Sequence, residues 1–324
     1  MWHRYSLAVV AGVLLGLLGG CGGDGETSAY VVRREFVAVD PTRRTPPNGS
    51  FPGAAERTIR FLVWQDESEA ARSTVRPLLV LAHGFGGLPE KFEAFARAIA
   101  GEGIVVAAPA FPLTNQNAPG GHETGLRDLV HQPADVSFVL QALLAADADP
   151  ASPLYTAFSA RQIAVLGHSL GAVTLLGLTR KQCCFDERIR AAIFVAAPSA
   201  LDAAFGADRV EPLAAPNLFI HGTADNVVPI AVGRGLYATA RPPRAFIGVL
   251  GAGHSDLLES QIEPPIAARR VMQEAVVAFL RAVFAGGEED WMVTLARLRS
   301  EGHDVDFVGL AGAQAAGEDV GEKR

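Results

Sequence analysis

Short apolar runs of strand length alternate with segments of helical period over most of the chain, and this alternation constrains the fold more than any other feature. Strands that alternate with helices are joined by crossover connections, which place the strands parallel in one sheet. The runs with this pattern are residues 77–82, 104–108, 163–166, 191–195, 217–220 and 245–250. The sequence therefore predicts an α/β fold with a mostly parallel, twisted sheet and helices on both faces.

Two earlier apolar runs, Tyr30–Val39 and Thr58–Trp64, are separated by a stretch rich in Pro, Gly and Arg, which favours an antiparallel hairpin at the sheet edge. Pro109 is expected to end the strand at 104–108. The polar segment 112–131 contains Gly and Pro and is expected to be a long surface loop bordering the site. The spacing of apolar residues predicts helices over 89–100, 133–145, 172–179 and 265–284.

The first residues are typical of an export signal, because His3 and Arg4 precede an apolar run over 7–18 that is too short to span a bilayer comfortably. The run ends in Leu18-Gly19-Gly20-Cys21, which resembles the bacterial lipobox. That resemblance implies that Cys21 is lipidated and that the protein is exported and anchored to the cell-envelope membrane. The alternative is an ordinary cleaved signal in which Cys21 has no role.

The chain is long enough for one catalytic domain, since 49% of its 324 residues are hydrophobic and can form a full core. We expect a lipoprotein signal at 1–20, a flexible tether at 21–29, a catalytic domain at 30–285 and an extension at 286–324. The extension is expected to be partly disordered, with one short helix packed through Trp291, Leu295 and Leu298. The oligomeric state cannot be predicted.

The charge of the chain bears on its partners. The net charge is −7 and the basic residues are scattered, so a nucleic-acid partner is not expected.

Cys183 and Cys184 are adjacent and cannot build a disulfide framework. Because a bridge between neighbouring cysteines is strained, we expect one buried and one idle thiol, with the vicinal disulfide as the alternative.

The pentapeptide Gly167-His168-Ser169-Leu170-Gly171 lies directly between the strand at 163–166 and the helix at 172–179. A serine on such a sharp strand-to-helix turn is held in a strained backbone, and flanking glycines allow close packing without a Cβ clash. The hydroxyl then projects outward, where it can meet a substrate carbonyl. Ser169 is therefore the candidate nucleophile, although a turn serine is the structural alternative.

A serine hydroxyl needs a base to remove its proton, and the base needs a carboxylate to orient it. His254 follows the last predicted strand, and Asp225 follows the strand at 217–220. We assign His254 as general base and Asp225 as its partner. Asp202 and Asp256 are the rivals for the acid.

Four other histidines and two acids receive no catalytic role. His83 and His168 flank motif positions, and we expect them to be packed or hydrogen-bonding neighbours. Asp135 lies at a helix start, where the helix dipole favours a carboxylate. The spacing of His122, Glu123 and His131 fits no metal-ligand pattern, so neither a metal nor another cofactor is expected.

Over residues 30–285 the chain resembles the α/β-hydrolase superfamily, whose catalytic residues follow the order Ser, Asp, His. Within it, the chain is most similar to the group of dienelactone-hydrolase-like proteins, platelet-activating-factor acetylhydrolases and bacterial cutinase-like polyester hydrolases. The matching segments are His83-Gly84-Phe85-Gly86, Gln132-Pro133-Ala134-Asp135-Val136, the Ser169 turn, Asp225-Asn226-Val227-Val228-Pro229 and His254. The resemblance implies an oxyanion hole made by the backbone N–H groups of Phe85 and Leu170.

Two departures from the group limit the substrate. Dienelactone hydrolases proper use a cysteine nucleophile, whereas this chain has Ser169. Polyester hydrolases usually carry an aromatic platform where this chain reads Ala197-Pro198-Ser199-Ala200. The segment before the strand at 217–220 is too short for a large lid domain, so the site is expected to be open.

The sequence thus predicts a serine carboxylesterase that acts on short-acyl or small soluble esters. Two alternatives remain open: an acyltransferase that uses the same three residues on a cell-envelope acceptor, and a non-enzymatic envelope-binding lipoprotein on the same fold.

Overall fold

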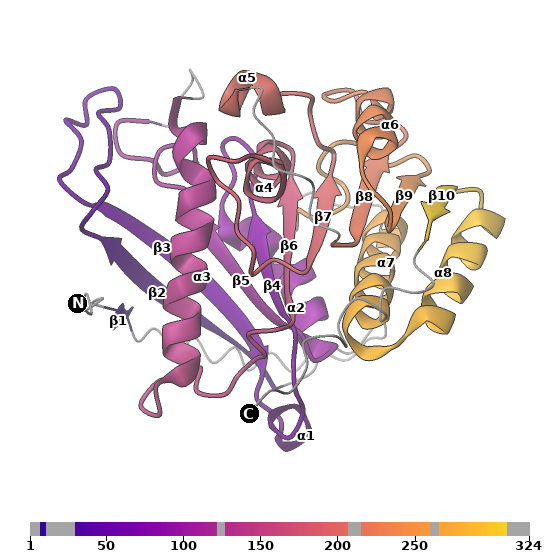
Figure 1. The fold of residues 1–324 in the computed structure, drawn as a ribbon, viewed down its shortest axis with the longest axis horizontal. Coiled ribbons are helices and arrows are strands. Elements are labelled where there is room, and N and C mark those ends of the chain that lie inside the picture. Colours follow the sequence, from indigo (N-terminus) through magenta and orange to yellow (C-terminus); the bar gives the residue numbers. More distant parts are fainter. Residues whose placement is uncertain (1–6, 11–29, 122–126, 207–214, 260–265, 310–324) are drawn as a thin grey trace, which may run out of the picture.

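The computed structural model describes residues 7–10, 30–121, 127–206, 215–259 and 266–309. Its strands join in one sheet in the order β1-β2-β3-β5-β4-β6-β7-β8-β9-β10 (Figure 1). The strands are β1 (Leu7–Val10), β2 (Val31–Asp40), β3 (Arg57–Asp66), β4 (Leu78–Ala82), β5 (Val105–Ala110), β6 (Ile163–His168), β7 (Ala191–Val195), β8 (Asn217–Gly222), β9 (Arg244–Val249) and β10 (Asp304–Val308).

Strands β5, β4, β6, β7, β8 and β9 are parallel neighbours, whereas β1, β2, β3 and β10 pair antiparallel at the two edges. The predicted mostly parallel sheet is therefore confirmed, and so is the early hairpin, which β2 and β3 form. Strand β4 is apolar on both faces because it lies in the middle of the sheet, covered from either side.

Helices cover both faces of the sheet (Figure 1). They are α1 (Glu69–Arg72), η1 (Pro89–Phe92), α2 (Glu93–Gly101), η2 (Arg127–His131), α3 (Gln132–Ala148), α4 (Leu170–Arg180), α5 (Leu201–Phe205), α6 (Ile230–Thr239), α7 (Ile266–Ala285) and α8 (Glu288–Ser300). Buried side chains of α2, α7 and α8 form one core against the sheet, and those of α3 and α4 form another on the opposite face. The layers thus have the predicted arrangement.

Among the described residues, one helical stretch, Arg127–Ala148, is long and apolar enough to cross a membrane by length and composition alone. More than half of it is buried inside the protein. This is the pattern of a core helix, and α3 packs on the sheet through Val136, Val139, Leu140 and Leu143 as its spacing predicts.

Two expectations about the loops are wrong. Pro109 does not end its strand, because β5 continues to Ala110. Pairing with β4 stops at Ala107, so the missing N–H of Pro109 removes no bond on that side, while β3 still pairs on the other. The segment 112–131 is not simply a surface loop, since Leu113, Thr114, Asp128 and Leu129 are buried.

A disulfide joins Cys183 and Cys184, so the expectation of one buried and one idle thiol is wrong. Neither side chain is buried. A turn closed by the Cys184 N–H and the Lys181 carbonyl keeps both cysteines at the surface, where neither is taken up by the core. The bridge is therefore a local feature of the loop after α4.

At the chain ends, the structure adds two edge strands that the sequence did not predict. Strand β1 lies inside the expected signal segment and pairs with β2. Outside the described residues are 1–6 and 11–29, which include the lipobox, Cys21 and the tether. The predicted helix through Trp291 is present as α8, and β10 follows it and pairs with β9. Residues 310–324 also lie outside the described part of the chain.

Candidate active site

Ser169 occupies the turn between β6 and α4 with φ 52° and ψ −118°. A non-glycine residue in this region of backbone space is strained, and such strain is typical of functional positions. The Ser169 N–H donates to the Val195 carbonyl at 2.9 Å, while its own carbonyl accepts from Ala172. The neighbouring strand and the first helical turn therefore fix the strained conformation.

The two flanking glycines are required by contact distance. A Cβ atom on Gly167 would lie 2.5 Å from the backbone of Gly171, and one on Gly171 would lie 2.1 Å from the carbonyl oxygen of Ala82. Both distances are shorter than real Cβ contacts. The start of α4 can therefore pack this closely on β6 and β4 only with glycine at both positions, as the motif predicts.

Asp225 and His254 come together from the loops after β8 and β9. His254 Nδ1 lies 2.7 Å from Asp225 Oδ2, and the Asp225 side chain is fully buried while that of His254 is 14% exposed. The other carboxylate oxygen accepts the N–H groups of Val227 and Val228 at 2.9 and 2.8 Å. Burial would raise the pKa of Asp225, but the bond from His254 and these N–H groups outweigh it and hold the pKa below its usual value.

An ionised Asp225 accepts the Nδ1 proton of His254 and so fixes the tautomer of the ring. Nε2 is then the nitrogen that can take a proton from a substrate or a nucleophile. This is the arrangement required of a general base with its orienting acid.

His168 connects His254 to the serine turn. Its Nε2 donates to the His254 carbonyl at 2.8 Å, and the two rings lie 4.9 Å apart between centroids. Because His168 directly precedes Ser169, this bond places the His254 backbone beside the nucleophile turn. His168 is thus a hydrogen-bonding neighbour, the role expected for it.

His221 also borders this site, and the sequence analysis missed it. Its Nε2 donates to the Val228 carbonyl at 2.8 Å and lies 3.3 Å from Asp225 Oδ2. The ring therefore closes the loop that carries Asp225. The available signal was its position at the end of β8, four residues before Asp225.

The Gly-rich loop after β4 lies against Ser169, since a Cβ atom on Gly84 would be 3.1 Å from Ser169 Cβ. His83 orders this loop: its Nδ1 donates to the Gly84 carbonyl at 2.7 Å and its Nε2 accepts the Phe111 N–H at 3.0 Å. Phe85 follows, and this residue is 41% exposed. The backbone of Phe85 is therefore close to the serine turn.

Leu170 is the first residue of α4, so its N–H has no carbonyl four residues earlier within the helix. Helix N-termini favour negative charge because their N–H groups and dipole point toward it. Its side chain is buried against Leu129 and Val173, which anchors this first turn. Leu170 and Phe85 thus place two backbone positions next to Ser169.

Of the two rivals for the acid, only the side chain of Asp256 belongs to the described residues. Asp256 accepts the Gly253 N–H at 2.7 Å and shapes the loop before His254, which removes it as the acid. The side chain of Asp202 and both His122 and Glu123 are outside the described residues. Among the residues that the structure describes, no group of three His, Cys, Asp or Glu side chains could hold a metal ion.

The buried histidines give a prediction for stability. Burial lowers the pKa of His83 to about 4, and burial together with the neighbouring His254 lowers that of His168 to about 4. In the unfolded chain a histidine titrates near 6.5, so between pH 6.5 and 4 the unfolded state binds more protons than the folded one. For each additional proton that the unfolded state binds, the free energy of unfolding falls by about 1.4 kcal/mol per pH unit as the pH decreases.

With both histidines contributing, the free energy of unfolding is expected to fall by several kcal/mol between pH 7 and pH 4.5. Urea unfolding followed by circular dichroism at half-unit pH steps measures it. Carboxylates titrate mainly below this window, so they do not mask the effect. A free energy that stays constant from pH 7 to pH 4.5 would contradict the assigned neutral, buried state.

No protein-family model matches the chain. Two uncharacterized proteins of Mycobacterium tuberculosis, from strains CDC 1551 / Oshkosh and H37Rv, are 30% identical over an alignment of 138 positions that covers 37% of this chain. The match spans 44% of the length of these relatives.

A solved structure of a ferulic acid esterase from Streptomyces cinnamoneus is similar with a TM-score of 0.59 and 19% identity, covering 79% of this chain and 90% of the esterase chain. The mostly parallel sheet and the helices on both of its faces agree with that likeness. Together they show that this chain has an α/β-hydrolase fold.

Proposed function

We propose that this chain is a serine carboxylesterase that hydrolyses short-acyl or small soluble esters through an acyl-enzyme at Ser169. The observation that carries the proposal is the 2.7 Å hydrogen bond between Asp225 and His254. The His254 carbonyl is in turn hydrogen-bonded to His168, the residue before Ser169. The similar fold of a ferulic acid esterase supports carboxylic esters as the substrate class.

The proposed reaction starts when Ser169 Oγ attacks the ester carbonyl carbon while His254 Nε2 takes the hydroxyl proton. The N–H groups of Leu170 and Phe85 stabilise the negative oxygen that forms. The bond to the alcohol then breaks, and His254 returns the proton to the leaving oxygen. A water, deprotonated by His254, attacks the acyl group and releases the acid, and Ser169 regains its proton.

Asp225 remains ionised throughout, because its hydrogen bonds favour the charged form. It stabilises the imidazolium of His254 after each proton transfer. The proposal therefore assigns Ser169 as nucleophile, His254 as general base and acid, and Asp225 as the orienting carboxylate.

A panel of p-nitrophenyl esters from acetate to palmitate, with the full chain in mild detergent, tests the substrate class. We expect the highest kcat/KM for acetate or butyrate and a steep decrease for long acyl chains. Absence of turnover on every ester would contradict the proposal. Adding a competing alcohol separates the acyltransferase alternative, because transfer yields a new ester in place of the free acid.

We also propose that the protein is an exported lipoprotein anchored through Cys21, on the strength of the lipobox-like Leu18-Gly19-Gly20-Cys21. Cells fed radiolabelled palmitate are expected to label the wild type and not Cys21→Ser. Equal labelling of the two proteins, or none of either, would contradict the anchor.

A further inference from the structure

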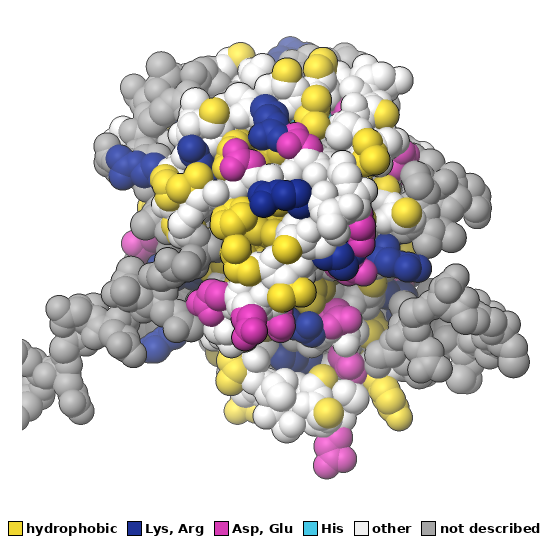
Figure 2. Space-filling view, turned by 90° about the vertical axis from the view of Figure 1, so that its right-hand side faces the viewer, with side chains coloured by type: hydrophobic (Ala, Val, Ile, Leu, Met, Phe, Trp, Pro, Cys, Tyr) yellow, Lys and Arg dark blue, Asp and Glu magenta, His cyan; other side chains and the backbone are white. Residues whose placement is uncertain are grey.

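The segment after α7 is built into the sheet next to the strand that leads to His254. Strand β10 pairs with β9 along its length, with Asp304 opposite Gly248 and Val308 opposite Arg244. Helix α8 packs on α7 through Trp291, whose ring lies 5.7 Å from that of Phe279. Figure 2 shows this side of the molecule, where acidic and basic side chains lie beside a group of hydrophobic ones. The segment is thus firmly docked beside the His254 loop.

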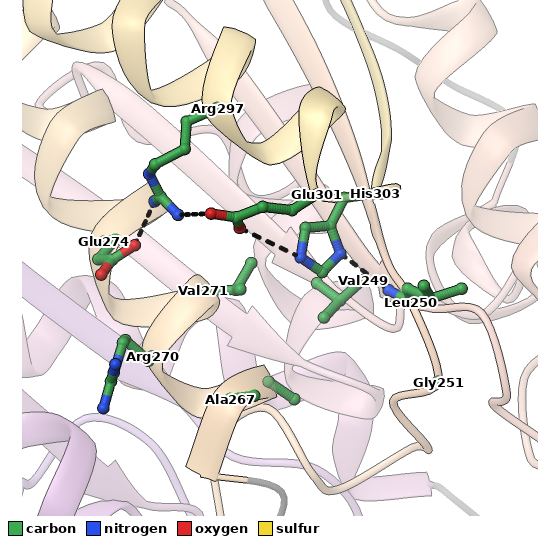
Figure 3. A pocket seen from close by; sticks show the side chains of 11 residues that line it. Val249, Leu250, Gly251, Ala267, Arg270, Val271, Glu274, Arg297, Glu301 and His303 are labelled. Carbon is green, nitrogen blue, oxygen red and sulfur yellow. Dashed lines mark hydrogen bonds and ion pairs between the residues drawn. The ribbon is translucent and has the colours of Figure 1, made fainter.

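His303, just before β10, contacts the start of that loop directly. Its Nδ1 accepts the Leu250 N–H at 3.0 Å (Figure 3). The backbone of Gly302 also lies against Leu250, since a Cβ atom there would be 3.7 Å from the Leu250 side chain. Leu250 is the first residue after β9, so its N–H lies just beyond the last backbone hydrogen bonds between β9 and β10. The His303 ring accepts this N–H in the way that a backbone carbonyl would.

A row of charged side chains leads to the His303 ring. Glu274 of α7 pairs with Arg297 of α8, Arg297 donates to Glu301 at 2.6 Å, and Glu301 lies 3.9 Å from His303 Nε2 (Figure 3). These groups line a pocket of about 430 Å³ behind the loop. The His303 side chain is only 11% exposed, and the backbone N–H of His303 donates to the Leu298 carbonyl. The ring is therefore fixed with Nδ1 toward Leu250.

The four residues after β9 each have a partner for their backbone N–H. Leu250 donates to His303, Gly251 to the Thr223 hydroxyl at 2.8 Å, Ala252 to the Val249 carbonyl and Gly253 to Asp256. His254 comes next. These four hydrogen bonds therefore set the path of the backbone up to His254. The acceptor of the first bond, His303, lies in the C-terminal segment.

We infer that His303 is a positioning residue for His254: by accepting the Leu250 N–H it fixes the loop so that the His254 ring faces Ser169. This rests on the proposed function, in which a small misplacement of the base lowers the rate of the chemical step. The effect is expected on kcat rather than on KM, because His303 contacts the loop from the pocket that Glu274 and Arg297 line and is not one of the residues assigned to the reaction. The segment after residue 285 is then part of the catalytic unit.

The test compares His303→Leu with His303→Asn in the full chain. Asparagine carries a side-chain oxygen that can replace Nδ1 as acceptor, whereas leucine fills similar space without one. We expect His303→Leu to lower kcat for p-nitrophenyl acetate about tenfold with KM unchanged. His303→Asn should recover most of the loss. Val308→Ala, at the far end of β10, is the control and should behave as the wild type.

Hydrogen exchange of the peptide that spans residues 249–256 gives a readout independent of activity. Its amides should exchange faster in His303→Leu and at the wild-type rate in His303→Asn. Wild-type exchange and wild-type kcat in His303→Leu would overturn the inference, as would equal losses in the leucine and asparagine variants. A wild type without esterase activity would overturn the proposed function instead, and the exchange rates would still decide whether His303 holds the loop.

Discussion

Replacing Ser169 by alanine is expected to reduce kcat for p-nitrophenyl acetate by about a million-fold, the size of effect seen when a serine-protease nucleophile is removed. Without the hydroxyl, no acyl-enzyme can form, and His254 has no proton to take from residue 169. The fold should survive, because the φ of 52° and the backbone bonds of the turn do not involve the hydroxyl. Alanine also occupies a positive-φ position elsewhere in this chain, at Ala196.

A matched serine serves as control. Ser159 lies shortly before β6, at the opposite end of the strand from Ser169, and its hydroxyl accepts the Arg161 N–H. Ser159→Ala should keep the wild-type kcat. Steady-state kinetics on both variants, with circular dichroism to check folding, measures the difference. A folded Ser169→Ala protein with substantial activity would contradict the role of Ser169.

The second large effect is expected on stability, from Arg57→Leu. Arg57 is fully buried on β3 and binds two buried carboxylates, Asp128 of η2 at 3.0 Å and Asp135 of α3 at 2.6 Å. Burial would lower the pKa of Arg57, but the two carboxylates hold it above its usual value. Removing the guanidinium leaves two negative charges without their main partner in the interior, which costs about 3–5 kcal/mol.

Arg60 provides the matched control for Arg57, since it lies on the same strand and also pairs with two carboxylates. Its partners are Glu35 and Glu90, and all three side chains are 28–39% exposed. Exposed pairs contribute about 0–1 kcal/mol, so Arg60→Leu should change the free energy of unfolding little. Urea titration of the wild type and both variants gives the comparison. Equal losses in the two variants would show that burial of the Arg57 cluster has no special effect.

The parts of the fold that the sequence predicts are those encoded locally. Strands such as β4 and β7 are continuous apolar runs, and the elbow at Ser169 is a five-residue motif between a strand and a helix. The loops that carry Asp225 and His254 follow predicted strands, and parallel neighbours end at the same edge of a sheet. Local patterns were therefore enough to predict that the loops with these residues lie at the same edge of the sheet.

The features that the sequence did not predict depend on partners far along the chain. Arg57 is buried only because Asp128 and Asp135, more than 70 residues away, meet it inside the protein. Strand β10 alternates charged and apolar residues over a short length and becomes a strand by pairing with β9. The bond from His303 to Leu250 spans 53 residues and no local pattern announces it.

The central claim is that Ser169 forms a covalent acyl-enzyme. Incubation with a fluorophosphonate, followed by intact-protein and peptide mass spectrometry, should show a single adduct located on Ser169 and none in Ser169→Ala. Asp225→Asn should react far more slowly, since loss of the orienting carboxylate lowers the rate by about ten-thousand-fold in a related triad. An unlabelled wild type, or an adduct on another residue, would contradict the central claim.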